Sequence, residues 1–456
     1  MRYGNTHHVV PRLGVCLIVA LIISIHNPVT IGAVTLDDCI KAALAANPDI
    51  QTYSYRIDAA EAQIKKAASA YYPRLTFSYS YTRTNNPPQA FMMQLNQRDL
   101  DMRSPSFDPN NPGDIDNIRT SVGFKYRLFD FGSRRLNYVM AKQGKEVSAE
   151  QRSAMQNQLI HQVSTYFYSA LQARAFVSVQ EKSVESLRES LRVATERYHF
   201  GTALKTDVLN LEVKLAQAQE DLIKARNGVQ LTVAALNTAI GKELVAAEEI
   251  RHEGISEDIP VLTGYESDDV ENRPELKMTR LNVDIKKDAL KKAKREYGPT
   301  VNAFGSVDWD GEDLGEYRDS YLVGARLEWN VFTGFYRKNS VAEALADLMV
   351  ARAELKHVRN QLLLDLKQSY LNTVEAGQRL EVARKSVKSA EESLRITQEL
   401  YKHKATDITE LFTAEVGLTA IRMRAVTAYY DYLKAHSNMG RARGNLVNRY
   451  VRSQQQ

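Results

Sequence analysis

Four segments of the chain alternate between apolar and polar residues with the period of two that a β-strand produces. In the first segment, apolar or aromatic side chains occupy positions 75, 77, 79 and 81, and hydroxyl side chains occupy the positions between them. Each segment is about ten residues long with aromatic residues toward its ends, which is typical of a transmembrane β-strand. The alternative is two amphipathic hairpins packed on a soluble core. The pattern predicts strands at about 74–84, 119–129, 300–310 and 320–330.

Two long stretches without proline follow the strand pairs, at 133–197 and 338–400. As continuous helices they would each be about 95–100 Å long, which is too long to pack into a compact domain. Charged residues fill most faces of both stretches, so we expect walls that meet water. Apolar residues at heptad spacing predict two packing seams against neighbouring helices, formed by Val177, Val184, Leu187, Leu191, Ala194 and Tyr198 and by Leu380, Ala383, Val387, Ala390, Leu394 and Tyr401.

The two halves of the chain are versions of one design. Pro48 and Pro73 recur as Pro274 and Pro299, at an offset of 226. Further on, the turn at 130–132 matches 332–334 at an offset of 202, and Glu196-Arg197-Tyr198 matches Glu399-Leu400-Tyr401 at 203. The first half therefore holds about 24 extra residues between its strands, which we expect to form a longer extracellular loop. These matches predict a first repeat at 34–241, a linker at 242–271 and a second repeat at 272–456.

The first 33 residues have the pattern of a secretory signal peptide. Arg2 and Arg12 precede an apolar run at 13–25, and the small pair Gly32-Ala33 follows it. The run is short for a bilayer span, so an uncleaved anchor is the less favoured alternative. Removal of this segment leaves Cys39 as the single cysteine, which gives no internal disulfide and no cysteine-based metal site. Two aspartates precede Cys39, so we do not predict a lipoprotein.

Composition excludes several classes of protein. The chain has 456 residues, of which 44% are hydrophobic and 25% charged, so it can bury a core and is not disordered. Its mean hydropathy is −0.39, and it lacks the apolar runs of about 20 residues that a polytopic helical membrane protein needs. The net charge of +5 comes from interspersed charges of both signs, which does not predict a nucleic-acid partner.

Closure of the sheet requires more than one chain. Unpaired strand edges are not tolerated in lipid, and membrane barrels need about eight strands or more, so four strands from one chain cannot close. Two chains would give an eight-stranded barrel filled by side chains. Three chains would give twelve strands and a water-filled lumen. A conduit therefore favours a homotrimer in contact with membrane lipid.

With these features, the mature chain resembles the TolC-like outer-membrane efflux proteins. The resemblance rests on the opening Leu36–Pro48, the doubled helix–strand–strand–helix plan, and the motif Arg197-Tyr198-x-x-Gly201-x-x-x-x-Thr206-Asp207-Val208-Leu209. It implies a mainly α fold, in which a trimeric twelve-stranded β-barrel in the outer membrane of a Gram-negative cell continues into a long periplasmic α-helical barrel. It also implies an exit duct for drug efflux or type I secretion, with a periplasmic adaptor protein docked at the helical tips and an inner-membrane pump as an indirect partner.

The resemblance also places a gate and a docking surface at the tips, residues 198–207 and 401–410. Three symmetry-related carboxylates near an axis would make a negative constriction, and their repulsion would raise their pKa values. In the alternative interpretation, Asp207 and Glu410 only stabilise the first turns of helices, by about 0.3–1 kcal/mol each. The gate residues are Thr206, Asp207, Tyr401 and Glu410, and the adaptor-docking residues are Tyr198, Gly201, Leu204, Lys404, Thr406 and Asp407.

The second tip departs from the family pattern. Lys404 stands where Gly201 stands in the first tip, and Thr413 replaces a second ring of acids. His199 and His403 lie in the tip turns, where a surface histidine is more often passive than a pH sensor.

The sequence contains no motif of a hydrolase, zinc protease or nucleotide-binding loop, so we expect no enzyme activity, cofactor or metal. The other classes left open are a non-porous trimeric coiled-coil protein of the envelope and an adaptor protein, although an adaptor would flank a helical hairpin with β-rich domains.

Overall fold

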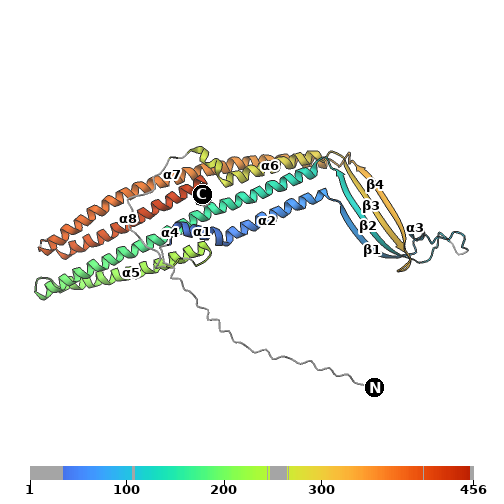
Figure 1. Ribbon diagram of the computed structural model, residues 1–456. Coiled ribbons are helices and arrows are strands. Elements are labelled where there is room, and N and C mark those ends of the chain that lie inside the picture. Colours follow the sequence, from blue (N-terminus) through green and yellow to red (C-terminus); the bar gives the residue numbers. More distant parts are fainter. Residues whose placement is uncertain are drawn as a thin grey trace, which may run out of the picture.

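The computed structural model describes residues 34–104, 108–243, 245, 246, 264, 266–403 and 405–451. The expected signal peptide at 1–33, Lys404 and most of the expected linker lie outside the described residues. The molecule is elongated, with paired helical tips at one end and a four-stranded sheet at the other (Figure 1). This confirms the mainly α fold class with four strands per chain.

Each half of the chain contains a helix, two strands, a long helix and a shorter helix in the same order, with additional short elements that differ between the halves. The first half contains α1 (Leu36–Ala46), α2 (Pro48–Ala68), η1 (Ser69–Tyr71), β1 (Arg74–Thr84), α3 (Pro87–Gln97), β2 (Ile115–Phe129), α4 (Ser133–His199) and α5 (Lys205–Ile240). The second half contains η3 (Ser267–Asn272), α6 (Pro274–Arg295), β3 (Thr300–Gly311), β4 (Arg318–Glu328), α7 (Tyr336–Lys402), α8 (Ile408–Arg443) and α9 (Leu446–Val451). Helices α4 and α7 both have 67 residues, and α5 and α8 both have 36.

The helix ends refine the match between the halves. Helices α4 and α7 begin 203 residues apart, so the turns before them match at 203 and not at 202. The left-handed pair Phe131 and Gly132 therefore corresponds to Gly334 and Phe335. The extra segment of the first half contains the 11-residue helix α3 in addition to loop. A proline at the first position of α3 and good helix formers after it explain why this part is helical.

The four strands form one antiparallel sheet in the order β1-β2-β3-β4. Phe77 pairs with Val122, Val122 with Val307, and Val307 with Tyr321, so β2 and β3 join the two halves. Strands β1 and β4 are the edges of this sheet. Many apolar and aromatic side chains of the strands are exposed, and together they form an apolar face of the sheet that the described residues leave uncovered. No helix in the described ranges combines the length and the apolar character needed to cross a membrane.

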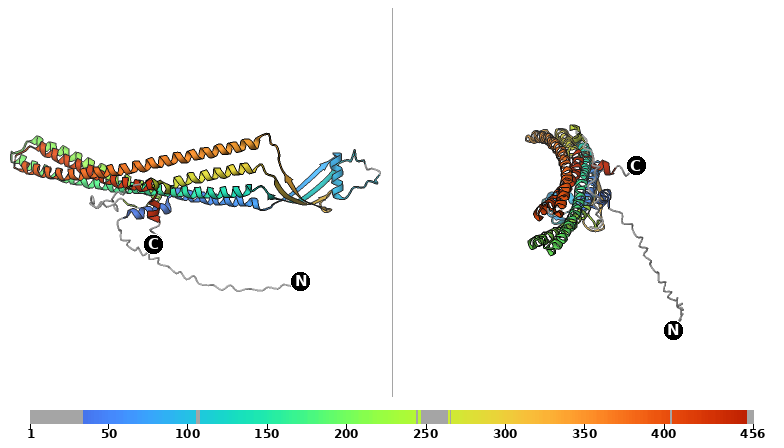
Figure 2. Two further views of the ribbon diagram at one scale, coloured as in Figure 1. Left: turned by 90° about the horizontal axis from the view of Figure 1, so that it is seen from above. Right: turned by 90° about the vertical axis from the view of Figure 1, so that its left-hand side faces the viewer.

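The helices form one curved layer and leave two open edges (Figure 2, right). In the half nearer the tips, the order across the layer is α5, α4, α8, α7. In the half nearer the sheet, the order is α2, α4, α6, α7. Helix α7 therefore forms one edge along its whole length, and α5 and α2 form the other.

Position in this layer determines how deeply the predicted seams are buried. Residues of α4 such as Val184, Leu187 and Ala194 are buried, because α4 has α5 on one side and α8 on the other. In α7, which lies at an edge, Leu380 is buried but the seam residues at 383–394 remain half-buried. Tyr198, which the heptad pattern places in the first seam, is exposed.

Candidate functional site: the helical tips

The first tip is a short turn between α4 and α5. The backbone N–H of Thr202 donates to the carbonyl oxygen of Arg197 at 2.8 Å, and that of Gly201 donates to the carbonyl of Tyr198 at 2.9 Å. Gly201 has a φ of +68°, a conformation that favours glycine. The second tip repeats the turn, since the N–H of Ala405 donates to the carbonyl of Leu400 at 2.9 Å. Lys404, the counterpart of Gly201, lies outside the described residues.

Arg197 joins the two tips. Its guanidinium donates to the carbonyl oxygens of Tyr401 and Lys402, at 2.9 and 3.0 Å, and lies 4.4 Å from the centroid of the Tyr401 ring. The last carbonyls of a helix lack partners within the helix and carry partial negative charge, so the cation suits the end of α7. The predicted gate residue Tyr401 is consequently buried against the first tip.

Arg197 itself was not among the predicted site residues. The sequence does show one feature that could have identified it: Arg197 is a cation in the first half, whereas the matching position in the second half is Leu400.

The predicted gate carboxylates stand at the starts of α5 and α8. Asp207 is half-buried, and its carboxylate accepts the backbone N–H of Leu204 at 3.2 Å, which is the helix-start contact of the alternative interpretation. Glu410 is exposed, and its N–H donates to the carboxylate of Asp407 at 2.9 Å, so Asp407 caps α8. Thr206 is exposed beside Asp207. In each half, the hydrogen bonds at these carboxylates stay within their own helix start.

A buried carboxylate lies further along α8, at Glu415. This side chain is 5% exposed, and its Oε1 accepts hydrogen bonds from the hydroxyls of Ser186 and Ser190 on α4, at 3.0 and 2.9 Å. Its Oε2 is buried without a hydrogen-bond partner. Burial raises the pKa of Glu415, although the two serine hydrogen bonds act in the opposite direction. The sequence signal for this contact is a pair of serines four residues apart on a helix face.

The predicted docking residues other than Lys404 lie at the outer end of the tips. Tyr198 and Leu204 are exposed beside the Gly201 turn, and Thr406 is half-buried in the second tip. The sequence reasoning missed Phe200, whose side chain is 83% exposed. The feature of the sequence that could have identified Phe200 is its place directly before the glycine of the turn. Exposed apolar side chains that gather on a surface are typical of protein-binding sites.

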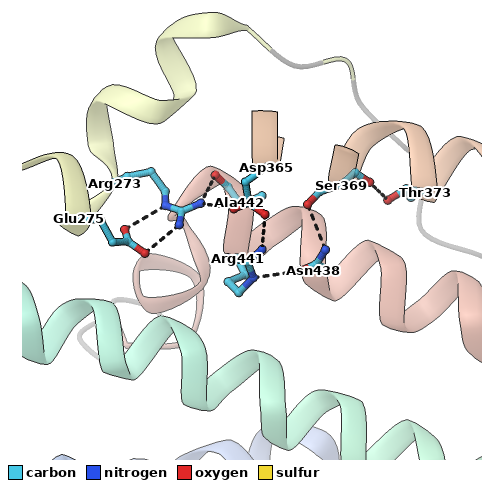
Figure 3. Close-up of polar contacts among 8 residues, drawn as sticks. All are labelled: Arg273, Glu275, Asp365, Ser369, Thr373, Asn438, Arg441 and Ala442. Atoms are coloured by element: carbon cyan, nitrogen blue, oxygen red, sulfur yellow. Dashed lines mark hydrogen bonds and ion pairs between the residues drawn. The ribbon is translucent and has the colours of Figure 1, made fainter. Parts of the chain in front are cut away.

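A polar cluster holds the second half together at mid-length, far from the tips (Figure 3). Arg273, at the start of α6, is buried and donates to Glu275, Asp365 and the carbonyl of Ala442. Arg441 also donates to Asp365, at 2.7 Å. Burial alone would raise the pKa of Asp365, but the hydrogen bonds from both arginines outweigh it and lower that pKa. This cluster ties α6, α7 and α8 together. Within the described ranges, no group of His, Cys, Asp and Glu side chains is placed to hold a metal ion.

Comparisons with known proteins agree with this architecture. The family model described as outer membrane efflux protein matches residues 39–242 and 267–445. The outer membrane protein TolC of Salmonella enteritidis is 20% identical over 418 residues, which cover 89% of this chain and 81% of the relative. The alkaline protease secretion protein AprF of Pseudomonas aeruginosa is 21% identical over 425 residues, covering 89% of this chain and 84% of the relative.

A solved structure has the same fold. The crystal structure of the outer membrane protein VceC from Vibrio cholerae superposes with a TM-score of 0.73 at 17% identity, over 90% of this chain and 96% of that one. The family model covers both repeats, with their long helices, both tips and all four strands. The chain therefore belongs to the outer membrane efflux protein family.

Proposed function

We propose that this chain is the outer-membrane exit duct of an efflux pump or a type I secretion system, assembled from three copies. The observation that carries the proposal is the open arc with an apolar sheet face at one end. Strands β1 and β4 have unpaired edges in one chain, and lipid does not tolerate unpaired backbone groups. Three copies would pair these edges in a twelve-stranded barrel, which has room for a water-filled lumen.

The helices extend the same closure below the sheet. The edge formed by α7 in one copy meets the edge formed by α5 and α2 in the next, which makes a periplasmic helical barrel. A wide, polar passage of this kind is a passive conduit. The energy for transport comes from an inner-membrane pump, and the duct itself performs no chemistry.

The gate lies at the tips, and it is built from Thr206, Asp207, Tyr401 and Glu410. Arg197 holds Tyr401 against the first tip within each chain. The exposed Glu410 of each copy, with Asp207, supplies a ring of carboxylates that favours cations and resists anions. Thr413 carries no charge, and its hydroxyl donates to the carbonyl of Thr409 on its own helix. The second half therefore contributes a single acidic ring, at Glu410.

The outer ends of the tips dock the periplasmic adaptor protein. Phe200 adds an exposed aromatic side chain to this surface, and interface hot spots are enriched in buried aromatic anchors. The predicted docking residues are Tyr198, Gly201, Leu204, Lys404, Thr406 and Asp407.

Membrane fractionation distinguishes this function from a non-porous envelope protein or an adaptor. The full chain, expressed in a Gram-negative cell, should remain in the outer membrane after salt and alkali washes. It should also migrate as a heat-sensitive trimer in detergent. Release of the protein by either wash, or a monomer in detergent, would refute the duct.

A further inference from the structure

The two halves of the chain form a seam with each other where α4 lies against α8. Its polar part includes the carboxylate of Glu415, which accepts hydrogen bonds from the hydroxyls of Ser186 and Ser190. The apolar part includes Val426, which is 5% exposed in a cluster against which Val179 packs. Both parts join the first half to the second, so they show how one repeat recognises the next.

The same residues recur at the two open edges of the layer. With the offset of 203, Glu415 corresponds to Glu212 on α5. The serines at 186 and 190 correspond to Ser389 and Ser393 on α7. In the isolated chain Glu212, Ser389 and Ser393 are all exposed. Helices α5 and α7 lie at opposite edges, so one chain has the residues of a second polar contact but cannot bring them together.

The apolar part of the seam recurs in the same way. Ile223 on α5 corresponds to the buried Val426, yet its side chain is 68% exposed. Val382 on α7 corresponds to Val179 and is 66% exposed. Removing aliphatic side chains from water is favourable, so these exposed residues favour association of the two edges.

The α7 edge has a groove that fits such a partner. The groove runs between α7 and α8, and Val382, Ser389 and Ser393 lie along its α7 side. Glu410 lies along its α8 side. The α7 residues of the proposed contact therefore line one groove together with the predicted gate residue Glu410.

We propose that α5 of one copy packs in the α7–α8 groove of the next, so that the Glu212 carboxylate accepts hydrogen bonds from Ser389 and Ser393 of that copy and Ile223 packs on its Val382. The contact rests on the three-copy assembly proposed above and specifies its register at the tips. It joins two different surfaces, so it closes a ring only by repeating around an axis. Each copy then sets the axial position and rotation of the tip hairpin beside it.

Other polar contacts between the two halves, including that of Arg197 with the end of α7, are not duplicated between copies. Leu400 occupies the position that corresponds to Arg197, so the next copy's Tyr198 receives no guanidinium. The serine–carboxylate contact is therefore the polar anchor between copies near the tips.

Thiol cross-linking in the full chain tests this contact. The double variant Glu212→Cys/Ser389→Cys, treated in outer membranes with a short bifunctional thiol reagent, should give covalent dimers and trimers from most of the protein. Burial raises the pKa of the Cys39 thiol to about 12, so this residue should not react. Each single variant should stay monomeric on denaturing gels, because copies of one residue lie far apart around the ring.

Two matched pairs control the geometry. Val213→Cys/Ser389→Cys should link at least tenfold less than Glu212→Cys/Ser389→Cys. Val213 corresponds to Val416, which is exposed although its neighbour Glu415 is buried in the seam within the chain. Glu415→Cys/Ser186→Cys should link within one chain and remain monomeric on denaturing gels.

The outcomes separate this contact from the duct itself. Trimers in detergent without links between copies, or equal linking by the Val213 control, would overturn the contact and leave the duct standing. Monomers in detergent would refute both. Ile223→Cys/Val382→Cys provides a second, independent pair should the first double variant fail to fold, and absence of links there would also overturn the contact.

Discussion

At the scale of single residues, the most informative difference is between Glu415 and Glu212. They occupy matching positions, yet Glu415 is buried against two serines and Glu212 is exposed. The unpartnered Oε2 of Glu415 shows that charge at this site is only partly compensated. A raised pKa in the folded state means that the folded protein keeps a proton that the unfolded chain releases. The resulting stabilisation is complete below the ordinary value of 4.5 and is lost as the pH rises through the raised pKa.

Replacement of Glu415 by glutamine should therefore change how stability depends on pH. Glu415→Gln removes the buried charge but keeps the oxygen that accepts the serine hydrogen bonds. Thermal unfolding followed by circular dichroism should show a higher midpoint than wild type at pH 8, and the difference should shrink as the pH falls through the raised pKa. Glu185→Gln, at an exposed position on α4, is the control and should track wild type. A constant difference at all pH values would contradict a buried, titrating carboxylate.

At the scale of elements, features that depend on local sequence patterns could be predicted, and features that depend on tertiary contacts could not. Alternation and heptads identified the strands and long helices, because both patterns come from neighbours along one segment. The helix α3 was expected as loop, since its prolines and asparagines indicate turns. The sequence could not show that Tyr401 is buried and its counterpart Tyr198 exposed. That difference depends on Arg197 reaching the end of α7 across about 200 residues of sequence.

Arg197 should consequently control how firmly the tips are held together. Arg197→Ala removes two charge-assisted hydrogen bonds that one guanidinium nitrogen makes at a half-buried site, and we expect them to contribute about 1.5–3 kcal/mol together. Amide hydrogen exchange in the tip segments 198–207 and 401–403 should rise roughly ten- to hundredfold, since about 1.4 kcal/mol corresponds to a factor of ten.

Arg192→Ala is the matched control, because among the described residues Arg192 pairs with Glu189 and Glu196 of its own helix and not with the second tip. Equal exchange in the two variants would show that the Arg197 contact does not hold the tips.

At the scale of the whole molecule, repetition explains both the shape and the need for partners. Each repeat contributes two strands and a helical hairpin, and one chain ends as an arc with open edges. The strand count predicted that one chain is incomplete. Which residues form its open edges could not be predicted, because that depends on the position of α5 and α7 on opposite sides of the layer. Asn47 and Arg273 show that the repeats match in three dimensions, because their side chains donate to the equivalent carbonyls of Ala239 and Ala442.

Single-channel conductance of the purified trimer in a planar bilayer tests the gated duct most directly. We predict discrete openings that divalent or trivalent cations block when added on the tip side. The combined Asp207→Asn/Glu410→Gln variant should weaken that block at least tenfold, because it removes the carboxylate ring. Glu343→Gln, at an exposed position on α7 near the sheet, should leave the block unchanged. An unaltered block in the combined variant would contradict the acidic gate. Folded trimers that stay silent, even with the tip carboxylates replaced, would contradict the duct itself.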